Sequence, residues 1–465
     1  MILCLRKQVS NLLRSPQKEV IYMSSIKRLW NRSFAILWQG QLISDFGNAV
    51  FAVTLGFWVL GATATPEMPT GNLALMGIIE ACFALPAVIL GPFAGAVADR
   101  INRKWILIAA DLIRGLLFGA MGAMLFFNAF PFWVIYPLAI LSGASGAFFS
   151  PAISAAIPDI VPKDSLSKAN SARGLSTTMT QLLGNSLGGF LFSVLKAPLL
   201  IFINGVSYLY AAVSQLFIKL PYKKSEGPRA NMLRDMADGM RYAFGSRGIR
   251  TLLLTSMLVN FFAVIGLSLM TPLFKSTLGF GVEKYGLVMG AMMAGAVIGM
   301  LTLSAIRIKA GQRSGLFGVA LMLMVCATVP IAMIVNVNWL YPLAFIAGVS
   351  NAIVNVMVQT IMQSTVPAHS RGKVFGILSM FSGGLQPIAM AVSGVIAGLA
   401  GIRPTMTVAF AVLVLAVLPL LVNKNFKAFI NTDIESDDSD VVENETPASE
   451  PTSSSDPSIL QPSAR

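Results

Sequence analysis

Long runs of apolar residues, separated by short polar turns, recur along almost the whole chain. Each run reaches roughly 20 residues, the length that an α-helix needs to cross the hydrocarbon core of a bilayer. The pattern therefore predicts an all-α, polytopic membrane protein. Twelve spans are expected, at residues 34–60, 73–98, 104–128, 132–157, 172–195, 198–218, 250–274, 284–306, 314–336, 339–363, 372–399 and 403–423.

The composition agrees with a membrane protein and argues against an enzyme. Of 465 residues, 55% are hydrophobic and 12% are charged, about half the charged fraction of a soluble domain. Cys4, Cys82 and Cys326 lie far apart, and His369 is the one histidine. These residues offer no metal-ligand spacing and no pair of nucleophile and base. We expect no metal, no cofactor and no enzymatic activity.

The distribution of basic residues predicts the orientation in the membrane. The net charge is +13, and the bases cluster in short loops beside the spans, with no basic patch suited to nucleic acid. With the N-terminus inside, predicted inside segments hold 28 Lys and Arg, among them Lys163, Lys168 and Arg173 after the fourth span, against four outside. Cytoplasmic loops carry such an excess. Both termini are therefore expected in the cytoplasm.

The same pattern predicts the domain organisation. A long inside segment at 219–249, with an amphipathic helix, separates two six-helix bundles. An ungapped shift of 205 residues aligns Gly143 with Gly348 and Ser145 with Ser350, as two parallel repeats would. The expected units are a basic N-terminal segment (1–33), a first bundle (34–218), the linker (219–249), a second bundle (250–423) and a disordered acidic tail (424–465).

Three carboxylates inside the predicted spans are candidates for proton coupling. Asp45, Glu80 and Asp111 fall within spans 1, 2 and 3, where an ionisable group is costly and indicates function. Asp45 is the first candidate and Glu80 the second. The alternative is that each fixes helix packing, and for Asp111 an i,i+3 pair with Arg114 makes the structural role the favoured one.

Polar residues at helical spacing predict a substrate cavity. Gln41, Asp45 and Asn48 share one face of span 1, and span 4 adds the aromatic ring of Phe148. Asn351, Asn355 and Gln359 share one face of span 10, where amides facing lipid would be costly. Hydrogen-bonding points with aromatic walls suit an amphipathic organic molecule better than a bare ion.

Small residues predict close contacts between helices. Gly184, Gly188 and Gly189 give span 5 a smooth surface for packing. A functional alternative is a hinge or sliding seam between the two bundles.

The stretch GPFAGAVADRINRKWIL, Gly91–Leu107, makes a very short basic turn between spans 2 and 3. It sets the topology, and its charges are also suited to a gate that breaks when the protein changes shape. The pattern from Gly95 through Asp99-Arg100 to Arg103-Lys104 resembles the loop between helices 2 and 3 of the major facilitator superfamily. Stretches 37–51, 148–171 and 239–262 resemble its branch of macrolide-type drug exporters and enterobactin-type siderophore exporters.

This resemblance implies a fold, a mechanism and a gate. The fold is twelve helices in two six-helix bundles related by pseudo-two-fold symmetry. The mechanism is alternating access, usually driven by proton antiport. The gate is formed by Gly95, Asp99, Arg100 and Arg103, with Asp159 at the end of span 4 as the acid that meets its basic side. Two positions depart from the pattern: Gly184-Asn185 replaces Gly-Pro, and span 4 has no arginine.

The sequence thus predicts a monomeric secondary transporter of a bacterial cytoplasmic membrane. Its expected partners are protons, the lipid bilayer and an amphipathic, drug-like substrate that it exports. Three alternatives stay open: a dedicated siderophore or metabolite exporter, an importer of a nutrient or lipid, and a membrane receptor that does not transport.

Overall fold

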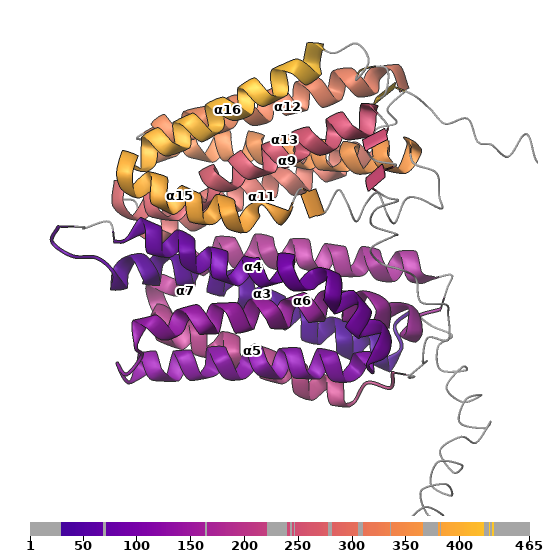
Figure 1. Ribbon diagram of the computed structural model, residues 1–465, viewed down its shortest axis with the longest axis vertical. Coiled ribbons are helices and arrows are strands. Elements are labelled where there is room, and N and C mark those ends of the chain that lie inside the picture. Colours follow the sequence, from indigo (N-terminus) through magenta and orange to yellow (C-terminus); the bar gives the residue numbers. More distant parts are fainter. Residues whose placement is uncertain are drawn as a thin grey trace, which may run out of the picture.

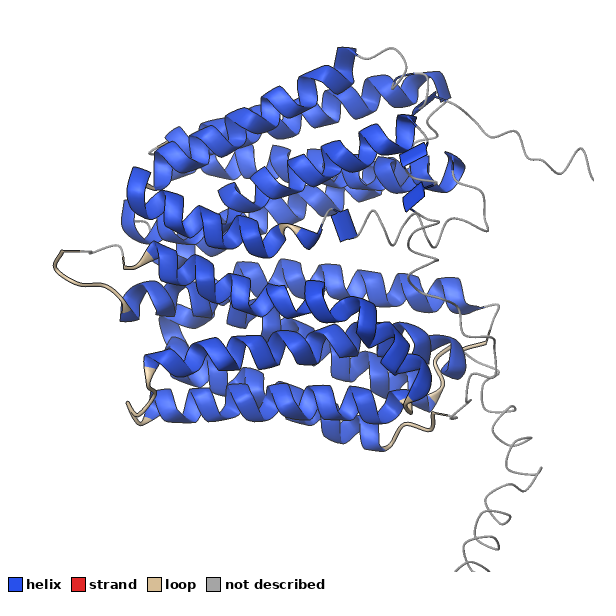
Figure 2. Ribbon diagram, in the orientation of Figure 1, coloured by secondary structure: helices blue, strands red, loops and turns tan. Residues whose placement is uncertain are grey.

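The structure, a computed structural model, describes most of the predicted transmembrane region. The described residues are helical, with short turns and no strand among them (Figure 2). They are 29–67, 71–162, 165–220, 240–241, 244–245, 247–277, 281–305, 310–334, 336–365, 380–381, 383–422, 427 and 430–431.

The N-terminal half contains four helices that each correspond to one predicted span and a fifth that is longer. They are α3 (Arg32–Ala62), α4 (Leu73–Arg100), α5 (Arg103–Phe126), α6 (Ile135–Ile160), which follows a short 3-10 turn at Phe132–Val134, and α7 (Leu166–Leu216). Asn31, Asn72 and Asn102 cap the first three, because each side chain accepts a hydrogen bond from a backbone N–H in the first turn.

Helix α7 makes two membrane crossings. It has 51 residues, about 77 Å at 1.5 Å per residue, whereas the hydrocarbon core is about 30 Å thick. The chain reverses at Lys196, whose backbone has φ 63° and ψ 167°, and Pro198 follows at the start of the second part. The predicted break between spans 5 and 6 lies at this position.

The C-terminal half contains the remaining helices. They are α9 (Arg247–Ser268), continued by α10 (Met270–Pro272) and the π-helical turn η3 (Leu273–Thr277), then α11 (Gly281–Ala305), α12 (Ala310–Met333), α13 (Val337–Thr365), α15 (Gln386–Ala400) and α16 (Ile402–Val422). In the described part of the chain, nine helices are long and apolar enough to cross a membrane, and α15 and α16 contain shorter apolar stretches. With α7 counted twice, the set fits the predicted twelve crossings.

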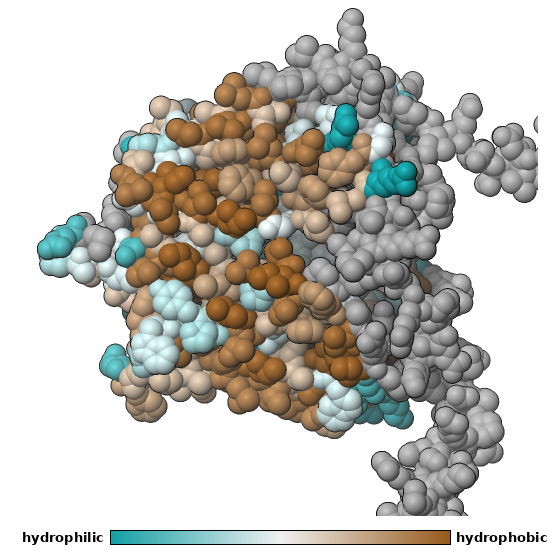
Figure 3. Space-filling view, viewed as in Figure 1, coloured by the Kyte–Doolittle hydropathy of each residue, from teal (hydrophilic) through white to brown (hydrophobic). Residues whose placement is uncertain are grey.

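The two halves form separate helix groups, α3–α7 and α9–α16 (Figure 1). Apolar side chains cover much of the face shown in Figure 3, as lipid contact requires. The predicted domain limits stay a prediction, because most of 1–33, 219–249 and 424–465 lies outside the described residues. Ile430 and Asn431 are an exception: Ile430 is buried and Asn431 bonds to Ser314 of α12. The prediction of disorder is wrong for these two residues.

The internal repeat has a counterpart in the packing. Gly143 of α6 lies against the backbone oxygen of Phe83 in α4, and Gly348 of α13 lies against the backbone oxygen of Met292 in α11. The aligned glycines thus make the same kind of contact, span 4 on span 2 and span 10 on span 8. Glycine is required at both positions because a Cβ would overlap the neighbouring backbone.

The two halves touch near one end of the helices. We call the side where α3 begins the near side and the side where it ends the far side. Gly77 of α4 lies against Met390 of α15, and Gly189 of α7 lies against Val282 of α11, all in the far-side part of their helices. Towards the near side, a Cβ placed on Gly91 or Gly174 would meet no described atom within 4 Å. The described contacts therefore close the far side.

Candidate functional site

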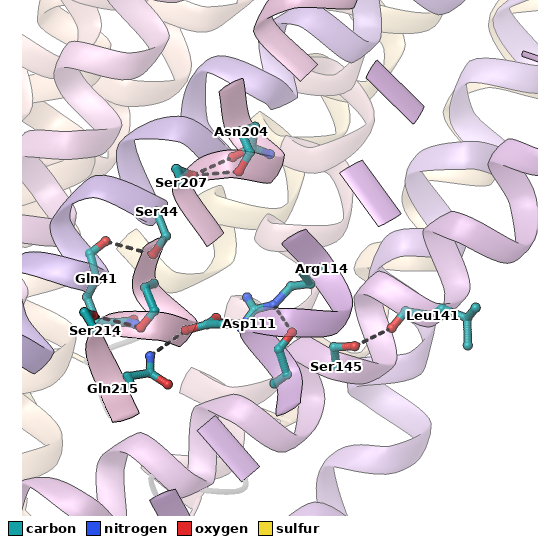
Figure 4. Close-up of polar contacts among 12 residues, drawn as sticks. Gln41, Ser44, Asp111, Arg114, Leu141, Ser145, Asn204, Ser207, Ser214 and Gln215 are labelled. Carbon is teal, nitrogen blue, oxygen red and sulfur yellow. Dashed lines mark hydrogen bonds and ion pairs between the residues drawn. The ribbon is translucent and has the colours of Figure 1, made fainter. Parts of the chain in front are cut away.

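The first polar group lies inside the N-terminal half, between α5 and α7. Asp111 is fully buried and forms an ion pair with Arg114, at 2.7 Å between Oδ1 and Nη2 (Figure 4). Gln215, at the near end of α7, donates from Nε2 to Asp111 Oδ2 over 2.6 Å. Both carboxylate oxygens of Asp111 are therefore bonded, which is the arrangement of a structural acid.

The guanidinium of Arg114 contacts a carbonyl oxygen and two aromatic rings in addition to Asp111. Its Nε donates to the Ala110 carbonyl oxygen over 3.2 Å. Its guanidinium carbon lies 4.7 Å from the centre of the Phe149 ring and 4.6 Å from that of Tyr208, so the charge is sandwiched between two aromatic faces. This places a fixed positive charge in the middle of the N-terminal half.

The second polar group surrounds Asp45. A small pocket between α3, α6 and α7 is lined by Asp45, Gln41, Arg173 and Thr177, with apolar walls. The Thr177 hydroxyl is in reach of the Asp45 carboxylate as a donor, and the positive charges of Arg173 and Arg114 act on it. Asp45 and Gln41 thus line the same pocket.

Arg173 has a different place from the one the sequence suggests. From the sequence, Arg173 is expected among the loop bases that set the topology. In the structure it lies inside α7, on the pocket that also contains Asp45. The signal in the sequence is its position one helical turn before Thr177, on a face that also carries Thr180.

The third polar group is Glu80, on α4 at the interface with the C-terminal half. The described residues provide Glu80 with no hydrogen bond, and no basic side chain acts on it. Its charge acts on Tyr285 of α11, whose hydroxyl lies near that of Thr271 and whose ring packs on Phe57 and Phe274. Glu80 is therefore the least compensated of the three predicted acids.

The predicted cavity residues are only partly brought together. Asn355 Nδ2 donates to the backbone oxygen and to Oδ1 of Asn351, at 2.9 and 3.1 Å, and Asn351 Nδ2 points to Met324 Sδ. These contacts stay within the C-terminal half. Asn48 is exposed and Phe148 is partly buried, and it is the neighbouring Phe149 that packs on Arg114. The side chain of Gln359 lies outside the described residues.

The predicted gate is seen in part. Arg103, at the start of α5, forms an ion pair with Asp159 near the end of α6 and donates to the Ala155 carbonyl oxygen over 3.0 Å. Both partners belong to the N-terminal half, so this pair does not itself join the two halves. A Cβ on Gly95 would meet no described atom, and the side chains of Asp99 and Arg100 lie outside the described residues.

The glycines of span 5 face two partners. A Cβ on Gly184 would meet Ala49 Cβ of α3 at 2.5 Å, and one on Gly188 would meet Val53 of the same helix at 3.3 Å. Gly189 points the other way, onto the backbone of Val282 in α11. This helix surface is therefore packed on both halves at once.

A metal centre finds no support in the part of the chain that the structure describes, where no three side chains of His, Cys, Asp or Glu gather. The chemistry available is thus that of ionisable groups and hydrogen bonds inside a helical membrane protein. Two repeated bundles that meet on one side of the membrane are the arrangement found in many secondary transporters.

Comparison with known families identifies the superfamily of this chain. The family model of the major facilitator superfamily matches residues 40–387, and the chain belongs to that superfamily. Its members are transporters and not enzymes, so this chain is a multi-pass membrane transporter.

Named relatives lie at low identity. Macrolide efflux protein A of Streptococcus pyogenes is 25% identical over 234 residues, half of this chain and 56% of that protein. The chain thus matches little more than half the length of this relative. Multidrug efflux pump Tap of Mycolicibacterium fortuitum is 22% identical, with 78% of this chain and 89% of Tap covered. The staphyloferrin A transporter of Staphylococcus aureus is 24% identical, with 78% and 91% covered.

Solved structures share the fold. A bacterial homologue of the human lysosomal transporter Spinster superposes with a TM-score of 0.64 at 15% identity, covering 87% of this chain and 98% of the other. A POT family transporter gives 0.66 at 12% identity, with 88% and 100% covered. The predicted fold of twelve helices in two bundles is confirmed.

Proposed function

We propose that the protein is a proton-coupled exporter of amphipathic organic compounds, working by alternating access in a bacterial cytoplasmic membrane. The near side is then the cytoplasm, with both termini on it, and the transporter acts as a monomer. Export is supported by relatives named as a macrolide efflux protein and a multidrug efflux pump. Amphipathic substrates are supported by the pocket beside Asp45, which combines ionisable groups with aromatic and aliphatic walls.

The position of Glu80 is the main support for proton coupling. It lies on the N-terminal half, and its charge acts on Tyr285 of the C-terminal half near the closed far side. A carboxylate in apolar surroundings with no cation beside it is poised to take up a proton, because the charged form is poorly solvated there. A proton at Glu80 would therefore change the interaction between the halves.

We propose the opposite order of the two candidate acids from the one expected from the sequence. Arg173 and Arg114 act on Asp45, and Thr177 can donate to it, so Asp45 has partners that Glu80 lacks. Asp111 is compensated by Arg114 and Gln215. In this proposal Glu80 carries the proton, Asp45 is part of the substrate site, and Asp111 supports the fold.

A second candidate is export of one siderophore or related metabolite, favoured by the relative named as a staphyloferrin A transporter. Transport into proteoliposomes of dyes, macrolides and siderophores, with and without a pH gradient, distinguishes the two. Gradient-driven movement of several unrelated compounds supports the multidrug exporter. Movement of one siderophore only supports the second candidate, and inward counterflow of a nutrient or lipid would indicate an importer. Binding without flux of any compound would indicate a receptor.

A further inference from the structure

The pocket beside Asp45 contains one acidic and one basic side chain on otherwise apolar walls. Phe34 and Trp38 of α3 and Ile153 and Ile157 of α6 line it together with Asp45 and Arg173. The two charges come from different helices, α3 and α7. This composition differs from the interior of a packed bundle, where opposite charges are directly bonded.

Arg173 keeps its hydrogen-bond donors unused. Among the described residues its guanidinium makes no hydrogen bond, and its one electrostatic partner is Asp45. A guanidinium has five N–H donors in a planar fork, which are suited to bidentate binding of an oxyanion. Arg114 in the same half is the contrast, since its charge is bonded to Asp111 and enclosed by two rings.

Asp45 also keeps capacity for a ligand. It forms no ion pair within 4 Å with Arg173 or Arg114, although both act on it electrostatically. Thr177 can occupy one of its acceptor positions, whereas a carboxylate offers about four. The acid and the base therefore face one pocket as separate, incompletely bonded groups of opposite sign.

We propose that this pocket binds a dipolar head group, with an oxyanion on Arg173 and a cationic or hydrogen-bond-donating nitrogen on Asp45. The apolar body of the ligand lies along Trp38, whose side chain is partly exposed, and continues towards the near side. The paired charges make a zwitterion a better ligand than a net cation or a net anion, because each ionic group then finds its complement. The inference rests on the proposed function in one respect, that the bound molecule is the one transported.

The test is binding of four matched compounds to the purified full-length protein in detergent. The compounds share one radiolabelled aryl-alkyl body and carry an α-amino acid head, its methyl ester, its N-acetyl derivative, or both modifications. The amino acid is expected to bind at least about ten-fold more tightly than either singly modified compound, as loss of one charge-assisted hydrogen bond implies.

Two variants separate the roles of the charges. Arg173→Gln is expected to abolish the preference for the acid over the ester and to keep that for the free amine over the acetylated amine. Asp45→Asn is expected to do the reverse, and Arg173→Lys to retain part of the acid preference because it keeps the charge without the fork. Equal affinity for all four compounds, binding of none of them, or an equal loss for all four in both variants would overturn the proposal.

The two proposals fail separately. Head-group selectivity in binding without any flux in proteoliposomes would contradict the transport function and leave the binding site intact. Gradient-driven flux of compounds whose affinity is indifferent to the head group would contradict the binding site alone.

Discussion

Asp111 and Gln215 lie 104 residues apart and are joined by a hydrogen bond of 2.6 Å from Gln215 Nε2 to Asp111 Oδ2. This bond connects the end of α7, which is the sixth membrane crossing, to α5, which is the third. Arg114 completes the group on the other carboxylate oxygen. Asp111 and Gln215 are buried. We therefore expect substitutions in this group to lower the stability of the fold more directly than they change transport.

Asp111→Ala should therefore destabilise the protein. It leaves the Arg114 charge without its ion-pair partner, which costs about 3–5 kcal/mol for a buried pair. Gln215→Leu removes one hydrogen bond to a charged group and should cost less, about 1.5–3 kcal/mol. Thermal unfolding in detergent measures both. An unchanged unfolding temperature in Asp111→Ala would contradict the structural role.

Glu80→Gln should uncouple transport while leaving the fold intact. Because Glu80 has no hydrogen bond within the described chain, its neutralisation removes no structural partner. The pH-gradient dependence of the rate should fall at least ten-fold, whereas exchange of labelled for unlabelled substrate continues. Asp45→Asn is the matched control, and it should alter affinity and keep the gradient dependence. Gradient-driven transport at the wild-type rate in Glu80→Gln would exclude it as the proton carrier.

Contacts on the far side can be locked by a disulfide. A Cβ on Gly290 of α11 would lie 3.2 Å from Ser186 Cβ of α7, close to the separation in a disulfide. Ser186→Cys with Gly290→Cys, in a background without the native cysteines, should cross-link and stop transport, with recovery on reduction.

The control pair for this cross-link lies within one half. Val53→Cys with Gly188→Cys joins α3 to α7, where a Cβ on Gly188 would be 3.3 Å from Val53 Cβ. This pair should cross-link without loss of transport. Full activity of the oxidised Ser186–Gly290 pair would show that the far side need not open.

The pair of Arg103 and Asp159 should contribute little to stability. Their side chains are 24% and 15% exposed, and such pairs contribute at most about 1 kcal/mol. A double-mutant cycle with Arg103→Gln and Asp159→Asn measures the coupling. If the predicted gate operates, either variant slows transport several-fold with unfolding temperatures near that of the wild type. Unchanged rates would leave the pair as a link between α5 and α6.

The segment after α16 is anchored to α12. Asn431 Oδ1 accepts from the backbone N–H of Ser314, its Nδ2 donates to Ser314 Oγ, and Ile430 is 2% exposed. A chain ending at Thr432 should unfold at the wild-type temperature. A chain ending at Phe429 lacks the buried Ile430 side chain, and its free energy of unfolding should fall by about 1.5–3 kcal/mol. Equal unfolding temperatures would show that the anchor contributes nothing.

The fold could be predicted from the sequence because membrane spans are determined by local composition. The break near Lys196 and the repeat relating Gly143 to Gly348 are both found in the structure. The ordered Ile430 was not predictable, since a single apolar residue beside an acidic tail has no periodicity. Its burial goes with the contact between Asn431 and Ser314, which are 117 residues apart in the sequence.

The candidate site was predictable as a set of residues but not as a set of roles. The presence of Asp45, Glu80 and Asp111 inside spans follows from the sequence. The pair of Asp111 with Arg114 also follows, from i,i+3 spacing on one helix. The charges that act on Asp45 do not, because Arg114 and Arg173 reach it from other helices. Glu80 stands out only when it is known that no described basic side chain acts on it.

Transport by the wild-type protein in proteoliposomes, with an imposed pH gradient and without one, tests the central claim most directly. Movement of amphipathic compounds that accelerates at least ten-fold in the gradient, together with proton movement in the opposite direction, is the result expected of a proton-coupled exporter. Movement at the same rate with and without the gradient, by a correctly folded protein, would contradict it.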